Sequence, residues 1–166
     1  LPRLKQVVHL PRPLYHWRTS RPHAYTHSML NSMGDDNGLF TAGPAHGAPP
    51  QNVRLAADDF LLDHMGGGFD LLYFTEQVAI PEALQAVVNA ARARGVPLQV
   101  IAVGAAQPVA GADTTLADAD GHVRQRYGVQ AGGAAYLLRP DQHVCARWLT
   151  LDANRLQAAL QTALPQ

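Results

Sequence analysis

The sequence predicts an α/β fold in which helices flank a mixed β-sheet. Two short apolar runs, residues 69–75 and 98–103, have the composition of buried strands. An amphipathic helical pattern separates them at residues 81–94. Two further runs of β-forming residues meet at a Pro-Asp turn between residues 134 and 148, which predicts a hairpin. The strand–helix–strand unit implies a right-handed parallel crossover, and the hairpin adds antiparallel strands.

Regular structure is predicted to begin after residue 52. Residues 58–65 can form a short helix with an apolar run at Phe60, Leu61 and Leu62, and three glycines at 66–68 end it. The strand at residues 69–75 follows directly.

The clearest helix covers residues 81–94. Pro81 suits the first helical position, where its missing N–H needs no partner, and Glu82 opposes the positive end of the helix dipole. Gly95 can adopt the left-handed conformation that ends many helices. One face carries apolar residues spaced three and four apart, at Leu84, Val87, Val88 and Ala91.

Three elements complete the order after the strand at residues 98–103. A short helix follows the Asp-Gly turn at residues 120–121 and ends in Tyr-Gly-Val at residues 127–129. The hairpin comes next, and Asp152 can cap a final helix. Its apolar face consists of Leu156, Ala159, Leu160, Ala163 and Leu164. This order is that of a thioredoxin-like domain, a mixed sheet with helices on both faces.

The composition disfavours several classes of function. The 166 residues fit one domain, or one domain with an appendage. The 13 basic and 13 acidic residues balance and form no basic cluster, which predicts no nucleic-acid binding. No apolar run approaches the roughly 20 residues of a membrane span, and no signal peptide is visible. A single cysteine cannot form an internal disulfide, so we expect a cytoplasmic location.

The chain is predicted to divide near residue 53. Residues 1–52 are rich in Pro, His, Ser, Asn and Gly and lack hydrophobic periodicity, so we expect an irregular linker or extension there. Residues 53–166 form the thioredoxin-like domain. We expect the extension to pack against the domain or against a homodimer partner, and deletion of residues 1–42 to leave the sheet folded. Because the first residue is Leu, we expect a processed chain or a piece of a longer one.

Thiol redox chemistry is disfavoured. It needs a thiolate near a helix N-terminus, but the turn at residues 75–81 contains no cysteine. Gly132-Gly133-Ala134 stands where the cis-proline of thioredoxin-like proteins is expected. Cys145 lies inside the second hairpin strand, where a cysteine commonly behaves as a small buried hydrophobic residue.

The other candidate sites are weak. His23 and His27 have the spacing of two metal ligands on a helix, but their surroundings favour a pair of surface histidines, and we assign no metal site. The Asp pairs at residues 35–36 and 58–59, and Asp118 with Asp120, resemble caps and turns. No serine lies in a nucleophile elbow, and the glycines at 66–68 precede a strand rather than open a helix. We assign no catalytic, cofactor-binding or metal-binding residue.

Arg139, Arg147 and Trp148 form a candidate interface at the hairpin. Arg and Trp are favoured at the centres of protein interfaces, which indicates an interdomain or subunit contact. The alternative is an ordinary stacked and ion-paired hairpin surface. The sequence does not decide between them.

Three segments resemble the C-terminal region of FAD-dependent aromatic hydroxylases of the phenol hydroxylase and 3-(3-hydroxyphenyl)propionate hydroxylase type. They are residues 47–55, residues 60–66 with 69–72, and residues 136–148. The most specific is the hairpin sequence Arg-Pro-Asp-Gln-His-Val, which begins at Arg139, together with Arg147. The family usually has glycine at the position of Gln142, which concerns only the geometry of the turn.

The resemblance implies a thioredoxin-like domain without redox cysteines, attached to a catalytic part that binds FAD, uses NAD(P)H and hydroxylates a phenolic ring. None of the flavin-binding motifs is in this chain, so we expect no cofactor here and the FAD domain of the parent as a partner. The leading hypothesis is a non-catalytic accessory domain. The alternatives are a stand-alone thioredoxin- or peroxiredoxin-fold protein with unrecognised chemistry, and a binding module that uses the His-rich N-terminal segment.

Overall fold

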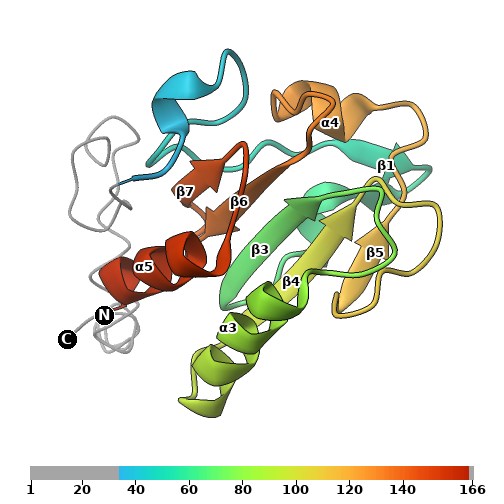
Figure 1. Ribbon diagram of the computed structural model, residues 1–166. Helices are drawn as coiled ribbons and strands as arrows, with labels where there is room; N and C mark the ends of the chain where they lie inside the picture. The colour runs from blue at the N-terminus through green and yellow to red at the C-terminus, as the bar shows by residue number, and fades with distance from the viewer. Residues whose placement is uncertain (1–33, 165–166) are drawn as a thin grey trace, which may run out of the picture.

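A five-stranded mixed sheet forms the centre of the molecule (Figure 1). The structure is a computed structural model and describes residues 34–164. The strand order is β5-β4-β3-β6-β7, with β3, β4 and β5 parallel and β6 and β7 antiparallel to their neighbours. The strands are β3 (Phe69–Phe74), β4 (Leu98–Val103), β5 (Thr114–Leu116), β6 (Ala134–Leu138) and β7 (Val144–Trp148).

Helices cover both faces of this sheet. The helices are α3 (Glu82–Ala93), α4 (His122–Arg126) and α5 (Ala153–Ala163). Helices α3 and α5 lie side by side on one face, and α4 lies on the other (Figure 1). The predicted fold class, a thioredoxin-like mixed sheet flanked by helices, is confirmed.

Alternation along the strands divides the interior into two apolar layers. In β3, Leu71 faces α3 and α5, whereas Leu72 faces the opposite layer, because successive strand residues point to opposite sides. The second layer also holds an aromatic cluster, in which the rings of Tyr127 and Tyr136 have centroids 5.1 Å apart. The Tyr136 hydroxyl donates a hydrogen bond to the Tyr127 carbonyl at 2.5 Å, so the cluster satisfies its own buried polar atom.

Most predicted elements are present with small shifts at their ends. Pro81 is the residue before α3 rather than its first helical residue, with a ψ of 137°. Asp152 caps α5 as predicted, since its carboxylate accepts the N–H of Arg155 at 2.8 Å. Gln142 in the hairpin turn has a φ of +61°, a left-handed conformation that explains why glycine suits this position.

The helix predicted at residues 58–65 is wrong in its first half. Residues 54–60 form a small antiparallel hairpin, β1 (Arg54–Ala56) with β2 (Asp59–Phe60), and only η3 (Leu61–His64) is helical, as a 3-10 turn. Asp58 adopts a φ of +59° at the turn of this hairpin. The apolar run was too short to distinguish a strand from a helix by periodicity.

The part of the predicted extension that the structure describes lies against the sheet. Residues 34–48 run along the outer side of β7 and contain one 3-10 turn, η2 (Asn37–Leu39). The division of the chain into residues 1–52 and 53–166 stays a prediction. His23 and His27 lie outside the described residues.

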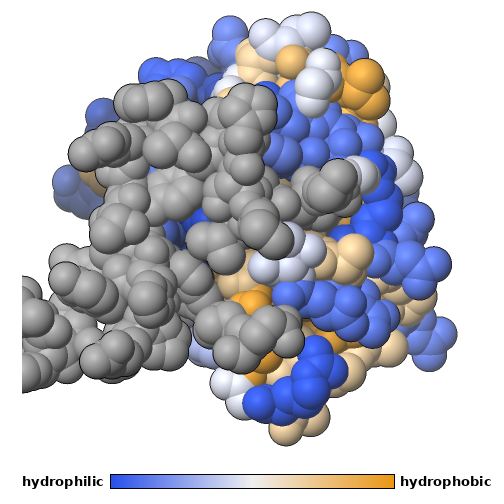
Figure 2. Space-filling view, turned by 90° about the vertical axis from the view of Figure 1, so that its left-hand side faces the viewer, coloured by the Kyte–Doolittle hydropathy of each residue, from blue (hydrophilic) through white to orange (hydrophobic). Residues whose placement is uncertain are grey.

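The surface of the described residues is mixed in character. On the face in Figure 2, hydrophilic and hydrophobic residues alternate over the coloured area. The large exposed hydrophobic residues, Leu39, Phe60 and Val78, lie on three separate elements or loops. No helix within residues 34–164 has the length and apolar character needed to cross a membrane.

Candidate functional site

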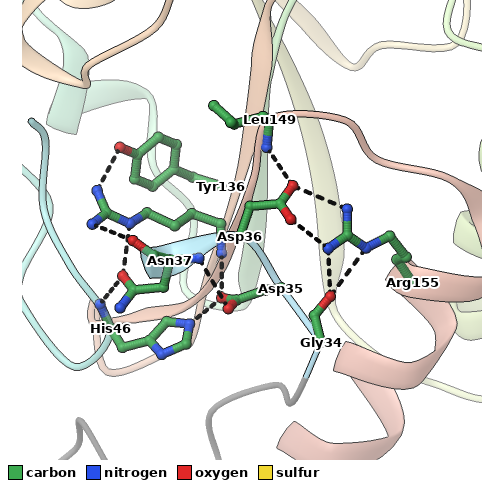
Figure 3. Close-up of polar contacts among 9 residues, drawn as sticks. Gly34, Asp35, Asp36, Asn37, His46, Tyr136, Leu149 and Arg155 are labelled. Carbon is green, nitrogen blue, oxygen red and sulfur yellow. Dashed lines mark hydrogen bonds and ion pairs between the residues drawn. The ribbon is translucent and has the colours of Figure 1, made fainter. Parts of the chain in front are cut away.

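The most developed polar site joins residues 34–46 to β7 and α5 (Figure 3). We call it the edge clasp and define it by Asp35, Asp36, Asn37, Arg147 and Arg155. It connects residues more than 100 positions apart in the sequence, so it is a tertiary feature rather than a local turn.

A local turn sets the two carboxylates of the clasp. The Asn37 N–H donates to Asp35 Oδ1 at 3.1 Å, and the Leu39 N–H donates to the Asp36 carbonyl at 2.8 Å. Asp and Asn favour such turns because their short side chains can replace a backbone partner. The turn leads into η2 and directs both carboxylates toward β7.

The carboxylates take the place of a neighbouring strand along part of β7. The Arg147 N–H donates to Asp35 Oδ2 at 3.0 Å, and the Leu149 N–H donates to Asp36 Oδ2 at 2.9 Å. Between them, the Asp36 N–H donates to the Arg147 carbonyl at 2.9 Å. These groups lie on the outer edge of β7, where a strand would otherwise leave donors and acceptors open to another chain.

Backbone bonds close the other end of the same edge. The Gly47 N–H donates to the Val144 carbonyl at 2.9 Å, and the Val144 N–H donates to the Ala48 carbonyl at 2.8 Å. Residues 35–48 therefore supply partners for outward groups of Val144, Arg147 and Leu149.

The Arg147 side chain binds residues 37–42. Its Nε donates to Asn37 Oδ1 at 2.7 Å, and its two terminal nitrogens reach the Asn37 carbonyl at 3.2 Å and the Ala42 carbonyl at 3.0 Å. The guanidinium carbon lies 4.4 Å from the centre of the Phe40 ring, which adds a cation–π contact. Arg147 is only 4% exposed, so these acceptors replace water that the buried cation has lost.

Arg155 on α5 holds Asp36 in a bidentate ion pair. Its terminal nitrogens lie 2.7 Å from Asp36 Oδ1 and 3.0 Å from Oδ2, and its Nε donates to the Gly34 carbonyl at 3.1 Å. The hydrogen bond from Arg155 holds the pKa of Asp36 below its ordinary value of 3.8, and the same bond raises the pKa of Arg155. Each residue therefore stabilises the charged form of the other.

His46 completes the cluster. Its Nε2 contacts Asp35 Oδ2, and its backbone N–H donates to Asn37 Oδ1 at 3.2 Å. Asp35 thus contacts both the Arg147 backbone and the His46 ring.

The three residues of the predicted interface lie in different places. Arg147 belongs to the edge clasp. Trp148 is fully buried in the layer under α3 and α5, and Arg139 is fully buried at the turn, with its Nε 3.4 Å from Asp141 Oδ1. All three side chains are buried within the described residues, and the adjacent residues Arg147 and Trp148 of β7 point into opposite layers. Their role in an interdomain or subunit contact stays a prediction.

Cys145 is buried in β7, as the sequence predicted. It is the extra residue of a β-bulge, since Leu137 pairs with Ala146 and Leu138 pairs with Val144. Burial raises the pKa of its thiol to about 12, so the group is a neutral thiol at physiological pH. Such a cysteine lacks the thiolate that nucleophilic chemistry requires.

A groove of about 310 Å³ lies at the carboxyl ends of the parallel strands. In open α/β sheets this is where ligands commonly bind. Its lining includes Glu76, Asp118, Asp120 and Arg124, so carboxylates outnumber the cation. The Asp118 carboxylate already accepts the N–H groups of Val123 and Arg124 at the start of α4.

These residues do not fit the pyrophosphate of a flavin dinucleotide. Such a group needs free N–H donors at a glycine-rich helix start, whereas the turn before α3 has no glycine and carries Glu76. Within residues 34–164, no three His, Cys, Asp or Glu side chains are grouped as metal ligands.

Known proteins resemble this chain in structure rather than in sequence family. No protein-family model matches the sequence, and no curated protein matches it. Aklavinone-11 hydroxylase, solved in a ternary complex with FAD and aklavinone, is 27% identical over 84% of this chain, with a TM-score of 0.57. The flavin-dependent monooxygenase PieE, solved with FAD and substrate, is 25% identical over 74% of this chain, with a TM-score of 0.51.

A third similar structure is the rebeccamycin biosynthetic enzyme RebC with reduced flavin, at 23% identity over 82% of this chain and a TM-score of 0.55, which supports the fold alone. The chain spans only 20% to 26% of the lengths of these three proteins. It is therefore structurally similar to a portion of FAD-dependent aromatic hydroxylases.

Sequence reasoning missed most of the edge clasp. It interpreted Asp35 and Asp36 as local caps and gave no role to Asn37 or Arg155. One available signal was the run of three short polar residues in a segment otherwise assigned to a linker. Their partners on β7 and α5 could not be inferred, because no local spacing connects them.

Proposed function

We propose that this chain is a non-catalytic C-terminal accessory domain of an FAD- and NAD(P)H-dependent aromatic-ring monooxygenase, where it contributes stability or subunit contact. The observation that carries the proposal is the similarity to aklavinone-11 hydroxylase over 84% of this chain but only 26% of that protein. The FAD and NAD(P)H sites would then lie in the parent protein outside this chain.

The chemistry of the described residues supports an accessory role. Cys145 is a buried thiol, and the turn between β3 and α3 offers no second sulfur. The groove at the carboxyl ends of the strands is lined by carboxylates, which would repel a phosphate. The most elaborate polar site, the edge clasp, holds one part of the chain to another.

The first test is the coding sequence upstream of Leu1. An extension of about 350 residues with a dinucleotide fingerprint is expected, since two to three further domains of ordinary size are needed. An initiator methionine directly before Leu1 would contradict the proposal and favour a stand-alone thioredoxin-fold binding module.

The second test removes this domain from the complete gene product. The shortened protein should keep its bound FAD and its NAD(P)H oxidation while its thermal midpoint or its oligomeric state changes. FAD titration of the present chain, followed by flavin fluorescence, should show no saturable binding. Micromolar binding by the chain alone, or loss of flavin binding with unchanged stability and assembly, would contradict the accessory role.

A further inference from the structure

The contacts of residues 34–48 have a feature that a simple linker does not need. Residues 34–48 contact β7 and α5, as described above, through strand-edge hydrogen bonds and through the guanidinium groups of Arg147 and Arg155. None of these bonds requires that the two partners belong to the same molecule. We call residues 34–48 the arm and the outer edge of β7 with Arg147 and Arg155 the acceptor.

The arm connects to the domain through a very short hinge. Ala48 is the last arm residue bonded to β7, and by Gln51 the chain belongs to the domain again, since the Gln51 carbonyl accepts the Tyr127 hydroxyl at 2.6 Å. Only Pro49 and Pro50 lie between them. Proline pairs favour an extended backbone, and short hinge loops favour exchange of an element between identical chains.

The acceptor also selects for an acidic segment. Direct pairing of two β7 edges around Arg147 would bring two buried guanidinium groups together, and like charges opposite each other destabilise a strand pair. An arm that carries Asp35 and Asp36 neutralises the acceptor and satisfies the N–H groups of Arg147 and Leu149. A second copy of this chain supplies such an arm with full complementarity.

We propose that the acceptor binds the arm of a second copy of this chain, in a reciprocal exchange that produces a dimer. Each arm then makes on the partner the contacts seen here within one chain. The exchange concerns this chain alone and does not depend on its membership in a monooxygenase.

A pair of charge-reversed variants tests the exchange. Asp36→Arg reverses the charge on the arm and leaves the acceptor unchanged. Arg155→Asp reverses the charge on the acceptor and leaves the arm unchanged. Neither can close its own clasp with the native charges, whereas an exchanged heterodimer of the two has opposite charges at both clasps. The two chains, refolded together from urea at equal concentration, should give a heterodimer by native mass spectrometry at a level at least tenfold above either homodimer.

Two controls keep the result interpretable if a single variant does not fold. The double variant Asp36→Arg with Arg155→Asp restores opposite charges within one chain. It should form its own dimer more readily than either single variant, although it lacks the carboxylate that accepts the Leu149 N–H. Wild-type chains, unlabelled and 15N-labelled, should give unlabelled, mixed and labelled dimers in a 1:2:1 ratio when they are refolded together at high concentration. The inference is overturned if wild type stays monomeric up to millimolar concentration and the two variants give no heterodimer. It is equally overturned if the dimers of both single variants form as readily as the heterodimer, because the interface would then lie elsewhere.

Discussion

The two edges of the sheet are protected in different ways. Strand β5 ends the sheet on one side with only three residues, so it exposes little backbone to another chain. Strand β7 ends the other side with five residues, all of them buried, and its outer groups are covered by residues 35–48 from the other end of the chain. A short edge needs little protection, whereas a long edge needs a separate segment.

Both edges nevertheless use the same chemical device. Near β5, the Asp113 carboxylate accepts the N–H of Val100 at 2.7 Å and contacts the guanidinium of Arg92. At β7, Asp35 and Asp36 accept strand N–H groups while Arg155 pairs with Asp36. A carboxylate can replace a strand carbonyl as acceptor, and at both edges an arginine forms an ion pair with it. The ion-paired carboxylate is therefore structural at both edges, and it is more buried at β7 than near β5.

The largest effect is expected when the whole cover of β7 is removed. Deletion of residues 1–42 removes the acceptors of Arg147 on Asn37 and Ala42, the Phe40 ring, and the ion pair of Asp36 with Arg155, and it uncovers the edge of β7. We expect this to lower the free energy of unfolding by about 3 kcal/mol or more. Urea unfolding of this variant and of a deletion of residues 1–33 measures the difference. Equal stability of the two would show that residues 34–42, and with them the edge clasp, contribute nothing to the stability of the domain.

Replacement of one side chain should have the next largest effect. Arg147→Ala removes hydrogen bonds to Asn37 and Ala42 and the contact with Phe40, and we expect a loss of about 2–3 kcal/mol. Arg54→Ala is the matched control, because Arg54 is exposed and its guanidinium donates to the carbonyl of Ala56 two residues away, with no other hydrogen bond to residues 34–164. A loss below that of the control would mean that Arg147 does not hold the arm.

Asp36→Asn should have a smaller, pH-dependent effect. The variant keeps one acceptor for Leu149 but loses the ion pair with Arg155, so we expect a loss of about 1–2 kcal/mol at pH 7. Because the pKa of Asp36 is lower in the folded state than its ordinary 3.8, its contribution is complete above that value and declines as pH falls through the folded pKa. The gap between variant and wild type should therefore narrow in acid. A gap that is constant from pH 7 to pH 2 would exclude the charge as its cause.

The smallest effect is expected at the opposite edge. Asp113→Asn alters an ion pair whose two side chains are 34% and 39% exposed, so solvent screens it, and we expect a loss of less than about 1 kcal/mol. Unfolding midpoints with and without 0.5 M NaCl measure it. If Asp113→Asn costs more than Asp36→Asn, burial does not explain the difference between the two edges.

The sheet could be predicted from the sequence because its signals are local. The apolar runs of β3 and β4, the periodic face of α3 and the capping residue Asp152 each depend on neighbours in the sequence. The prediction of a helix at residues 58–65 was wrong in its first half because it used the same local signals. The apolar run Phe60, Leu61 and Leu62 suits either a strand or a helix.

The candidate site could not be predicted in this way. Asp36 lies 119 positions from Arg155, and the favourable turn chemistry of Asp35-Asp36-Asn37 explained these residues locally before any partner was needed. Arg147 was singled out for its type, but its burial follows from the return of residues 34–48 over β7. Burial of this kind depends on tertiary packing, which no spacing in the sequence records.

Amide hydrogen exchange tests most directly whether carboxylates close the edge of β7. In the wild type, the amides of Val144, Arg147 and Leu149 should all be protected, with the amide of Leu72 in β3 as the reference for the centre of the sheet. In Asp36→Ala, the amide of Leu149 should lose its protection first, that of Arg147 next, and that of Val144 least, because its acceptor is the backbone of Ala48. Unchanged protection of Leu149 and Arg147 in this variant would contradict the account.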